Sequence, residues 1–341
     1  MAVSALASRI FRNLFGTQEI RDIFTDKADV QSLIEVEAAL ARAEAAVGVI
    51  PADAGKALTD AFARLQIEYT RRDGQVYPLR GDDASMLQMK RGIILVKREL
   101  EILKGILKGL VATHRDTILR NSERIEEIEQ RCLLVQFGGA AGIIASLGAD
   151  DTGLRVREQL AVELGLNNPD ITWHVALDNV AEILNFLALA GGTLGKIVLD
   201  MMKMSSNEFD EKRNPISSEV ILAASKMLRA NASLGLDVMV TDYERASGPW
   251  HLEWVALPDA VVTAVGVLHR TDCALGGLGV NVDSMKRHLY STQGLIVGEA
   301  VMMGQAPHLG QQGAHDLVYE ACKCVIEQNR TLLEILPELP P

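Results

Sequence analysis

A short basic segment stands directly before a predicted helix, in the order Lys212, Arg213, Asn214 and Pro215. Two cations at a helix start oppose the positive end of the helix dipole, and a bound anion would remove that conflict. Free backbone N–H groups together with Lys212 would bind a carboxylate, and Asn214 adds a neutral donor. The segment is therefore a candidate anion site. The alternative is a polar turn, in which Pro215 ends one element and a serine at 217–218 caps the next.

A second candidate is the loop of residues 242–259, which combines charged and aromatic side chains between two predicted helices. It holds Arg245, Trp250, His251 and Trp254 around a Gly-Pro pair. Such a set can form the wall of an active site for a planar, charged molecule. The alternative is that the tryptophans plug a corner between the helices.

The third candidate is His174, which follows Trp173 and precedes Asp178 by four residues. An imidazole that a carboxylate orients can act as a general acid or base. The alternative is a histidine that caps or packs against the start of a helix.

No cofactor or metal motif accompanies these residues. The sequence contains no P-loop, no GxGxxG after a strand and no Ser-His-Asp order. Cys322 and Cys324 lie two apart on a predicted helix, so they point to different faces, and they lack the spacing of a zinc site. We therefore expect no cofactor, no metal, and cysteines that are reduced and structural.

The composition indicates a globular helical protein. Hydrophobic residues make up 48% of the 341 residues and aromatic residues only 4%, which suits packed helices better than β-sheet layers. The net charge of −11 argues against a nucleic-acid partner. No signal peptide is apparent, and the most apolar segment, 183–195, is flanked by charges and predicts a buried core helix. We expect a cytoplasmic protein without a membrane partner.

Apolar periodicity predicts helices over residues 26–51, 82–116, 122–148, 170–204, 217–240 and 256–280. Ser122 is the expected N-cap of the third helix. The fourth is apolar nearly all round, and Gly191-Gly192 within it predicts a close neighbouring helix. Helices longer than the average of about 11–12 residues predict an elongated all-α bundle. A helix that is apolar on every face needs further neighbours, so association of subunits is expected.

Four stretches together resemble one family, the fumarase/aspartase superfamily. They are residues 19–51, "KRNPISSE" at 212–219, "ERASGPWHLEWVALPD" at 244–259, and residues 281–310. Within that superfamily, the Gly-x-Trp-x-x-Glu-Trp pattern is most similar to the 3-carboxy-cis,cis-muconate cycloisomerases, and the adenylosuccinate lyases are the next most similar group.

The resemblance implies a mostly α-helical homotetramer whose central bundle carries active sites shared between subunits. It implies an N-terminal helical domain at 1–80, a central long-helix domain at 81–300, and the start of a small C-terminal helical domain at 301–341. The implied activity is a cofactor-free cycloisomerase or lyase of the β-ketoadipate pathway, which acts on a small polycarboxylate. In it, a substrate carboxylate adds to a conjugated C=C.

The resemblance also implies roles for particular residues. By the matching motif, Lys212 and Asn214 would be the catalytic residues that hold and stabilise a substrate carboxylate. The substrate-binding residues would be Arg213, Arg245, Trp250 and His174.

The sequence departs from the family's pattern at three expected active-site loops. The family's loop with a catalytic serine survives only as Lys212 to Pro215, its Thr-Ser-x-Asp segment is missing before Asp82, and its catalytic-histidine segment is missing between Thr117 and Ile118. We hypothesise that these loops are left out of the sequence. Two alternatives follow: a C–N lyase of the adenylosuccinate or argininosuccinate type, and a non-catalytic scaffold with the same fold.

Overall fold

The computed structural model describes residues 4–65, 82–107, 112–138, 142–204, 216–243 and 248–339. Within these ranges the regular structure is helical, and the β pairing is one isolated bridge between Leu134 and Asn167. The predicted all-α fold class is therefore confirmed.

The helices have the following bounds: α1 Arg12–Phe15, α2 Gln18–Ile23, α3 Asp26–Val47, α4 Ala52–Ala63, α5 Asp82–Ile106, α6 Ala112–Cys132, α7 Thr152–Leu164, α8 Asp178–Met204, α9 Ile216–Val238, α10 Glu253–Gly276, α11 Val282–Ser291, α12 Gly298–Gln328 and α13 Leu332–Ile335. Short 3₁₀ helices join some of them, including η4 at Pro249–Leu252.

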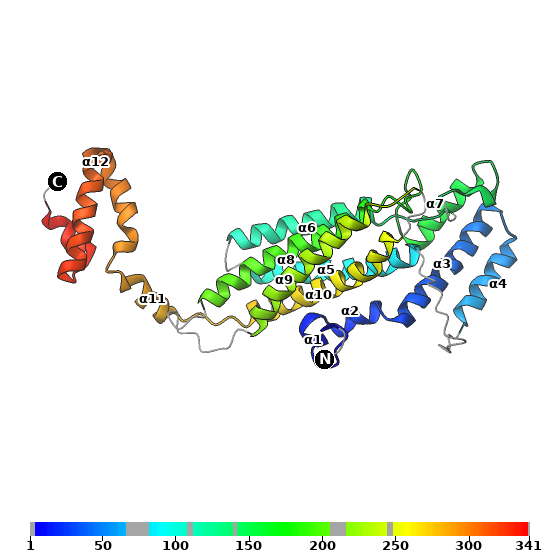
Figure 1. Ribbon diagram of the computed structural model, residues 1–341, viewed down its shortest axis with the longest axis horizontal. Coiled ribbons are helices and arrows are strands. Elements are labelled where there is room, and N and C mark those ends of the chain that lie inside the picture. The colour runs from blue at the N-terminus through cyan, green and yellow to red at the C-terminus, as the bar shows by residue number, and fades with distance from the viewer. Residues whose placement is uncertain are drawn as a thin grey trace. The chain divides into compact units, whose positions relative to one another are not determined.

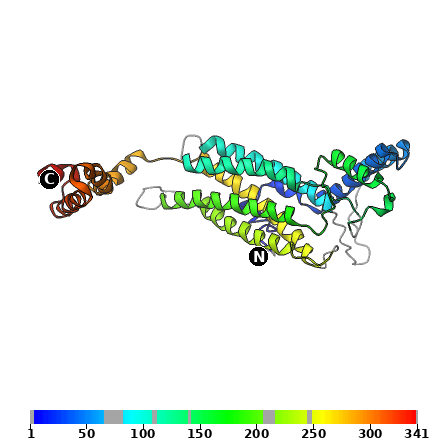
Figure 2. The ribbon, with the colours of Figure 1, turned by 90° about the horizontal axis from the view of Figure 1, so that it is seen from above.

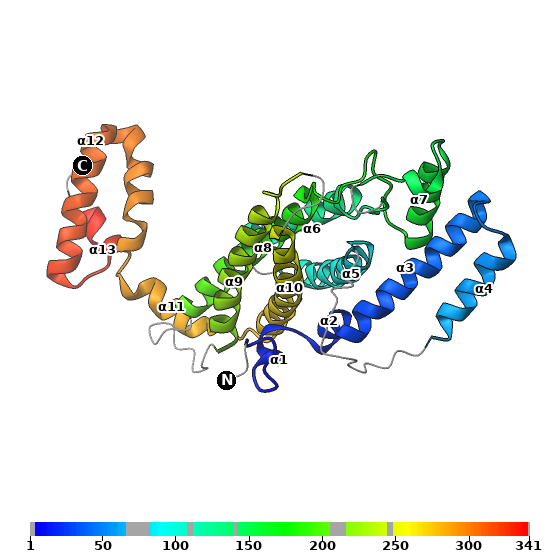
Figure 3. The same cartoon turned by 45° about the vertical axis from the view of Figure 1, so that its right-hand side comes forward.

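The chain folds into two compact units, the first made of Met1–Met201 with Pro215–Gly277 and the second of Met202–Asn214 with Leu278–Pro341. In the first unit, the long helices α5, α6, α8, α9 and α10 lie side by side (Figures 1 and 2). Helix α3 packs against α4, α5 and α7 beside them (Figure 3). The division into three domains stays a prediction.

The second unit has its own small core. Ala321 and Val325 of α12 pack against Leu332 and Ile335 of α13. Helix α12 is bent at Gly310, where φ is 74° and the backbone leaves the helical region. A glycine accommodates this left-handed conformation without steric cost.

Glycines bring α8 and α9 close together. A Cβ on Gly191 would lie 2.6 Å from Cδ1 of Leu228, and one on Gly235 would lie 2.6 Å from Cδ1 of Leu184. Both leucines are buried, so they cannot move aside freely. The predicted close neighbour of α8 is therefore confirmed at Gly191. At Gly192, by contrast, a Cβ would meet no atom within 4 Å.

Helix α8 also passes a composition test for membrane spans. It is the one described helix that is long and apolar enough to cross a bilayer. In the structure 56% of its most apolar window is buried inside the protein, as expected of a core helix. The sequence prediction of a buried helix over 183–195 agrees with this placement.

Several predicted boundaries were wrong. The expected helix over 82–116 is two helices, because α5 ends at Ile106 and α6 begins at Ala112. Ser122 is not an N-cap but lies inside α6, where its hydroxyl donates to the carbonyl of Ile118 at 3.2 Å. The serines at 217–218 lie inside the first turn of α9 rather than before it, since α9 begins at Ile216.

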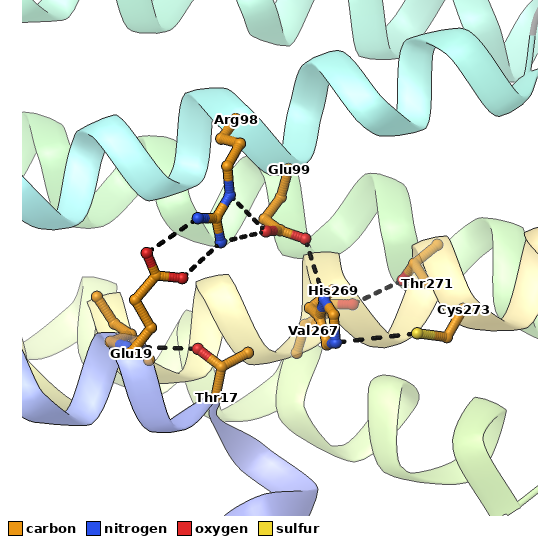
Figure 4. A network of polar contacts seen from close by, with 9 residues as sticks. Thr17, Glu19, Arg98, Glu99, Val267, His269, Thr271 and Cys273 are labelled. Atoms are coloured by element: carbon orange, nitrogen blue, oxygen red, sulfur yellow. Dashed lines mark hydrogen bonds and ion pairs between the residues drawn. The ribbon is translucent and has the colours of Figure 1, made fainter.

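A polar network joins α2, α5 and α10 (Figure 4). Arg98 donates to Glu19 at 3.0 Å and, through Nη2, to Glu99 at 2.8 Å. The other oxygen of Glu99 lies 3.3 Å from Nδ1 of His269, whose Nε2 faces the Cys273 thiol at 3.9 Å. The Glu99 side chain is only 2% exposed. Its charge is therefore held by Arg98 rather than by water.

Asp272 extends this network into the core. It is buried, and no hydrogen-bond donor of the described residues reaches either of its carboxyl oxygens. Burial raises the pKa of Asp272 to about 8, with a further contribution from the neighbouring Glu99 carboxylate. Asp272 is therefore protonated at neutral pH.

We predict that Asp272→Asn makes stability less sensitive to pH. The pKa of Asp272 is raised from about 3.9 in the unfolded chain, so the folded state binds more protons above that value. Stability therefore falls as the pH rises through the window up to about 8. An amide cannot ionise and can donate to Glu99. The thermal midpoint between pH 6 and pH 9, measured at fixed protein concentration, should fall less in Asp272→Asn than in the wild type.

The matched control for this experiment is Asp60→Asn, because Asp60 is exposed on α4. It should keep the wild-type pH dependence. A wild-type pH slope in Asp272→Asn would contradict a raised pKa of Asp272 in the folded protein.

Two adjacent glycines of α8 should respond to alanine with opposite signs. Gly191→Ala should destabilise the protein by about 1–3 kcal/mol, because the methyl group collides with buried Leu228. Gly192→Ala should stabilise it by up to about 1 kcal/mol through helix propensity, because that site is open. Urea unfolding of both variants measures the difference. Equal losses would show that a second copy covers Gly192.

Candidate functional site

The structure describes only part of the predicted site. Lys212, Arg213, Asn214 and Arg245 lie outside the described residues. Trp250 belongs to η4, where its backbone is described but not its side chain. His174 lies half-buried in the turn that precedes α8.

His174 and η4 lie at the end of the bundle where α9 finishes; we call this the His174 end. The hydroxyl of Thr241, just after α9, donates to the carbonyl of Val175 at 3.3 Å. The 3₁₀ helix η4 packs against α9 and leads into α10. His174 and Trp250, although far apart in the sequence, are therefore brought to the same end of the first unit.

Buried hydrogen bonds fix the backbone around the His174 end. The indole of Trp173 donates to the carbonyl of Val135 at 3.1 Å, and Asp83 accepts from the backbone N–H of Gln136 at 2.6 Å. These bonds tie together the start of α5, the segment after α6 and the turn before α8. His174 is thus held on a rigid support. Trp173 itself is a buried structural residue.

The tryptophans of the second candidate loop are not equivalent. Trp254 lies in the first turn of α10, where its ring makes an edge contact with the ring of His251 at 4.6 Å. The His251 ring is in turn 2.9 Å from the carbonyl of Gly248. These contacts agree with the alternative in which aromatic side chains fill a corner between helices. They leave Trp250 as the tryptophan assigned to a site.

Lys212 belongs to the opposite end of α9. It precedes Ile216, the first residue of that helix, by four residues, so the chain can place it at most about 14 Å away. Helix α9 has 23 residues and is therefore about 34 Å long. The His174 end lies beside the last turn of α9, at the other end of this helix.

The described residues near the start of α9 form a cleft of about 520 Å³. Ser217 of α9 lines it together with Arg12 and Arg21 of the N-terminal segment and with His269 and Arg270 of α10. We did not predict the two N-terminal arginines as site residues. Their only signal in the sequence is that they belong to residues 9–21, a segment with three arginines and a single acidic residue.

The cysteines behave as structural residues in the described parts of the chain. All four are free, and Cys132 is buried, where its thiol donates to Glu182 at 3.1 Å. Burial, with the Glu182 charge next to it, raises the pKa of the Cys132 thiol well above its usual range. The thiol is therefore protonated and unreactive. Within the described residues, no group of three histidine, cysteine or acidic side chains could hold a metal ion.

Three comparisons place this arrangement among known proteins. A fumarate lyase from Mesorhizobium sp. BNC1 superimposes with a TM-score of 0.88 at 37% identity, over 96% of this chain and 90% of that one. Trans-aconitate decarboxylase 1 of Mycosarcoma maydis is 32% identical over 96% of this chain and 81% of its own length. The 3-carboxy-cis,cis-muconate cycloisomerase of Pseudomonas aeruginosa is 30% identical over 97% and 89%. No family model matches.

The alignment with the Pseudomonas cycloisomerase runs over 409 residues, whereas this chain has 341. The relative therefore carries internal residues without a counterpart here. At Thr117 and Ile118, one of the three predicted gaps, helix α6 is unbroken. The identity over nearly the whole length, the long-helix bundle and the four matching stretches agree with one another. The chain belongs to the fumarase/aspartase superfamily.

Proposed function

We propose that the protein is a cofactor-free lyase or cycloisomerase, and that it interconverts 3-carboxy-cis,cis-muconate and a carboxymuconolactone. The observation that carries this proposal is the 30% identity to a cycloisomerase over nearly the full length, combined with the Lys212–Pro215 and 244–259 motifs. The relatives named above act on aconitate and carboxymuconate, which are both unsaturated tricarboxylates. The substrate should therefore be a small unsaturated polycarboxylate of the β-ketoadipate pathway.

The reaction sets the roles of the assigned residues. A substrate carboxylate adds across a conjugated C=C, and the electrons that leave that bond develop as negative charge next to another carboxylate. Lys212 and Asn214 would stabilise this charge with a cation and a fixed N–H dipole. Proton transfer to the carbon then completes the addition. Arg213, Arg245, Trp250 and His174 would bind the remaining carboxylates and the planar carbon chain.

Assembly is part of the proposal. We propose a homotetramer whose active sites are shared between subunits, so that Lys212 of one copy meets the His174 end of another. The apolar face that α8 exposes, with Leu189 49% and Leu199 37% exposed, supports further contacts with copies of the chain. We place this tetramer in the cytoplasm.

Two alternatives remain within the same family. A C–N lyase of the adenylosuccinate or argininosuccinate type would use the same carboxylate site and release fumarate. A non-catalytic scaffold is favoured by a specific observation, namely that the family's serine-bearing and histidine-bearing loops have no counterpart in the sequence. The scaffold would keep the bundle and lose the proton donor.

An ultraviolet assay of the full-length protein tests these functions. The loss of conjugated absorbance should be followed with 3-carboxymuconate, with trans-aconitate and with adenylosuccinate as substrates. We expect turnover of 3-carboxymuconate. Turnover of adenylosuccinate instead would establish the C–N lyase. The absence of turnover with every substrate, from a tetramer of normal stability, would favour the scaffold.

We predict that Lys212→Ala lowers kcat/KM at least about a hundredfold, since it removes a charge that stabilises the transition state. The thermal midpoint should change little, because a surface lysine contributes little to folding. Lys212→Arg is the matched variant that keeps the charge, and it should retain part of the activity. Parallel losses of activity and stability in Lys212→Ala would support the polar-turn interpretation instead.

We further predict that two inactive variants restore activity when they assemble together. Lys212→Ala and His174→Ala should each be impaired alone. Co-expressed in equal amounts, they should regain up to about a quarter of the wild-type sites, because a site shared between chains takes each residue from a different copy. Each variant expressed alone is the control. A site built within a single chain would show no recovery, since every chain then lacks one residue.

A further inference from the structure

The cleft beside the start of α9 has an unusual charge. Among the described residues, three arginines and one histidine line it, namely Arg12, Arg21, Arg270 and His269, and no aspartate or glutamate does. The remaining lining residues are neutral. The chain as a whole carries a net charge of −11. A concave positive site in such an acidic protein is a local exception, and converging cations of this kind attract anions.

Arg12 has no charged partner among the described residues. Its side chain takes part in no ion pair or hydrogen bond there, and its Nε is buried without an acceptor. Buried polar atoms are normally satisfied, by protein or by a bound species. Arg21 shows the same orphaned Nε. The pKa of Arg21 is lowered first by burial and then by the neighbouring charge of Arg12. The two arginines therefore repel each other.

Arg21 is held in place by the N-terminal segment. It donates to the carbonyl of Arg12 at 3.1 Å, to the side chain of Asn13 at 2.7 Å and to the side chain of Gln18 at 3.1 Å. Each of these acceptors is neutral. They fix the position of the guanidinium without cancelling its charge.

Arg270 of α10 binds the backbone of the same N-terminal segment. It donates to the carbonyls of Leu14 and Asn13, both at 2.6 Å. The backbone at Phe15 approaches so closely that a Cβ on Gly266 would lie 2.3 Å from the Phe15 carbonyl oxygen. The wall of the cleft is therefore preformed, and Arg12 is the guanidinium that no hydrogen bond among the described residues holds in place.

The nearest acids do not neutralise this charge. Asp22 and Asp259 line an adjoining cleft that shares Arg12 and Arg21. Neither forms an ion pair with these arginines, and Asp22 accepts a hydrogen bond from Gln18 at 2.5 Å. Burial raises the pKa of Asp259, which favours its neutral form. The charge of Asp22 raises the pKa of Arg21 and so compensates it in part, but among the described residues no acid forms an ion pair with Arg12.

We propose that this cleft binds a polyvalent oxyanion of the di- or tricarboxylate class, with Arg12 as its movable donor and Arg21 and Arg270 as fixed positive charges. Guanidinium groups pair with carboxylates through two parallel hydrogen bonds, and the orphaned Nε of Arg12 and its terminal nitrogens offer that geometry. Phosphates share this chemistry. The cleft lies outside the residues assigned to the reaction, so the site stands independently of the proposed function.

Isothermal titration calorimetry of the full chain with tricarballylate tests the site, at constant ionic strength set with NaCl. We expect saturable binding to the wild type and a dissociation constant about tenfold higher in Arg12→Gln. Arg9→Gln is the matched control, because Arg9 is an exposed arginine of the same segment, and it should bind as the wild type does. Equal dissociation constants for Arg12→Gln and Arg9→Gln, or no binding by the wild type, would overturn the proposal.

Arg12→Glu provides a second, independent measurement. The new carboxylate would supply the missing counter-ion to Arg21, so the thermal midpoint without added anion should rise, and tricarballylate should no longer raise it. A lower midpoint with an unchanged response to tricarballylate would contradict the site.

Pyrophosphate identifies the ligand class. Binding of tricarballylate alone through Arg12 supports a carboxylate site, and equal binding of both supports a site for polyvalent oxyanions in general. Preference for pyrophosphate would overturn the carboxylate assignment. If the wild type binds tricarballylate through Arg12 but turns over no substrate, the proposed reaction is contradicted and the anion site in the cleft is supported. If it turns over substrate but does not bind tricarballylate through Arg12, the reaction is supported and the anion site is contradicted.

Discussion

The close packing of α8 against α9 determines where the loops that carry the candidate site residues lie. Gly191 and Gly235 let the two backbones approach through Leu228 and Leu184, so the helices stay in register over their whole length. Long antiparallel helices carry their loops only at their ends, and α9 separates those ends by about 34 Å. In the proposed tetramer, the residues assigned to the two ends meet across subunits. Under that proposal, assembly is a condition of function.

Polar groups inside this bundle follow two different rules. Glu99 is buried, but Arg98 compensates its charge, and Asp272 avoids a second uncompensated charge by keeping a proton. Such groups hold α5, α10 and α2 together. Arg12 and Arg21 are different, because they lie close to each other and neither forms an ion pair with a carboxylate among the described residues, although the charge of Asp22 acts on Arg21. The paired charges of Arg98 and Glu99 stabilise the fold, whereas the cluster of Arg12 and Arg21 indicates a binding site for an anion.

The sequence predicts those features that depend on neighbours along the chain. Apolar periodicity located the helices, and the glycines of α8 announced a close contact that the structure has at Gly191. The break between α5 and α6 was missed, because residues 107–111 contain no proline and a single glycine. Ser122 was wrongly predicted as an N-cap, because serine favours helix starts. Within a helix, however, its hydroxyl can also donate to the carbonyl four residues earlier, as it does here. The pairing of Asp272 with Glu99, and the cleft of Arg12, join segments remote in sequence, so no local pattern announces them.

The departures from the family concern chemistry far more than fold. Helix α6 passes unbroken through Thr117 and Ile118, one of the three places where the sequence departs from the expected family pattern. The buried core of the first unit is formed by side chains of the helices themselves, such as Leu184 of α8 and Val261 of α10. A bundle built in this way closes whether its end loops are long or short. Stability therefore says little about activity in this chain. Under the proposed function, the residues that bind carboxylate and transfer the proton, rather than the bundle, distinguish an enzyme from a scaffold.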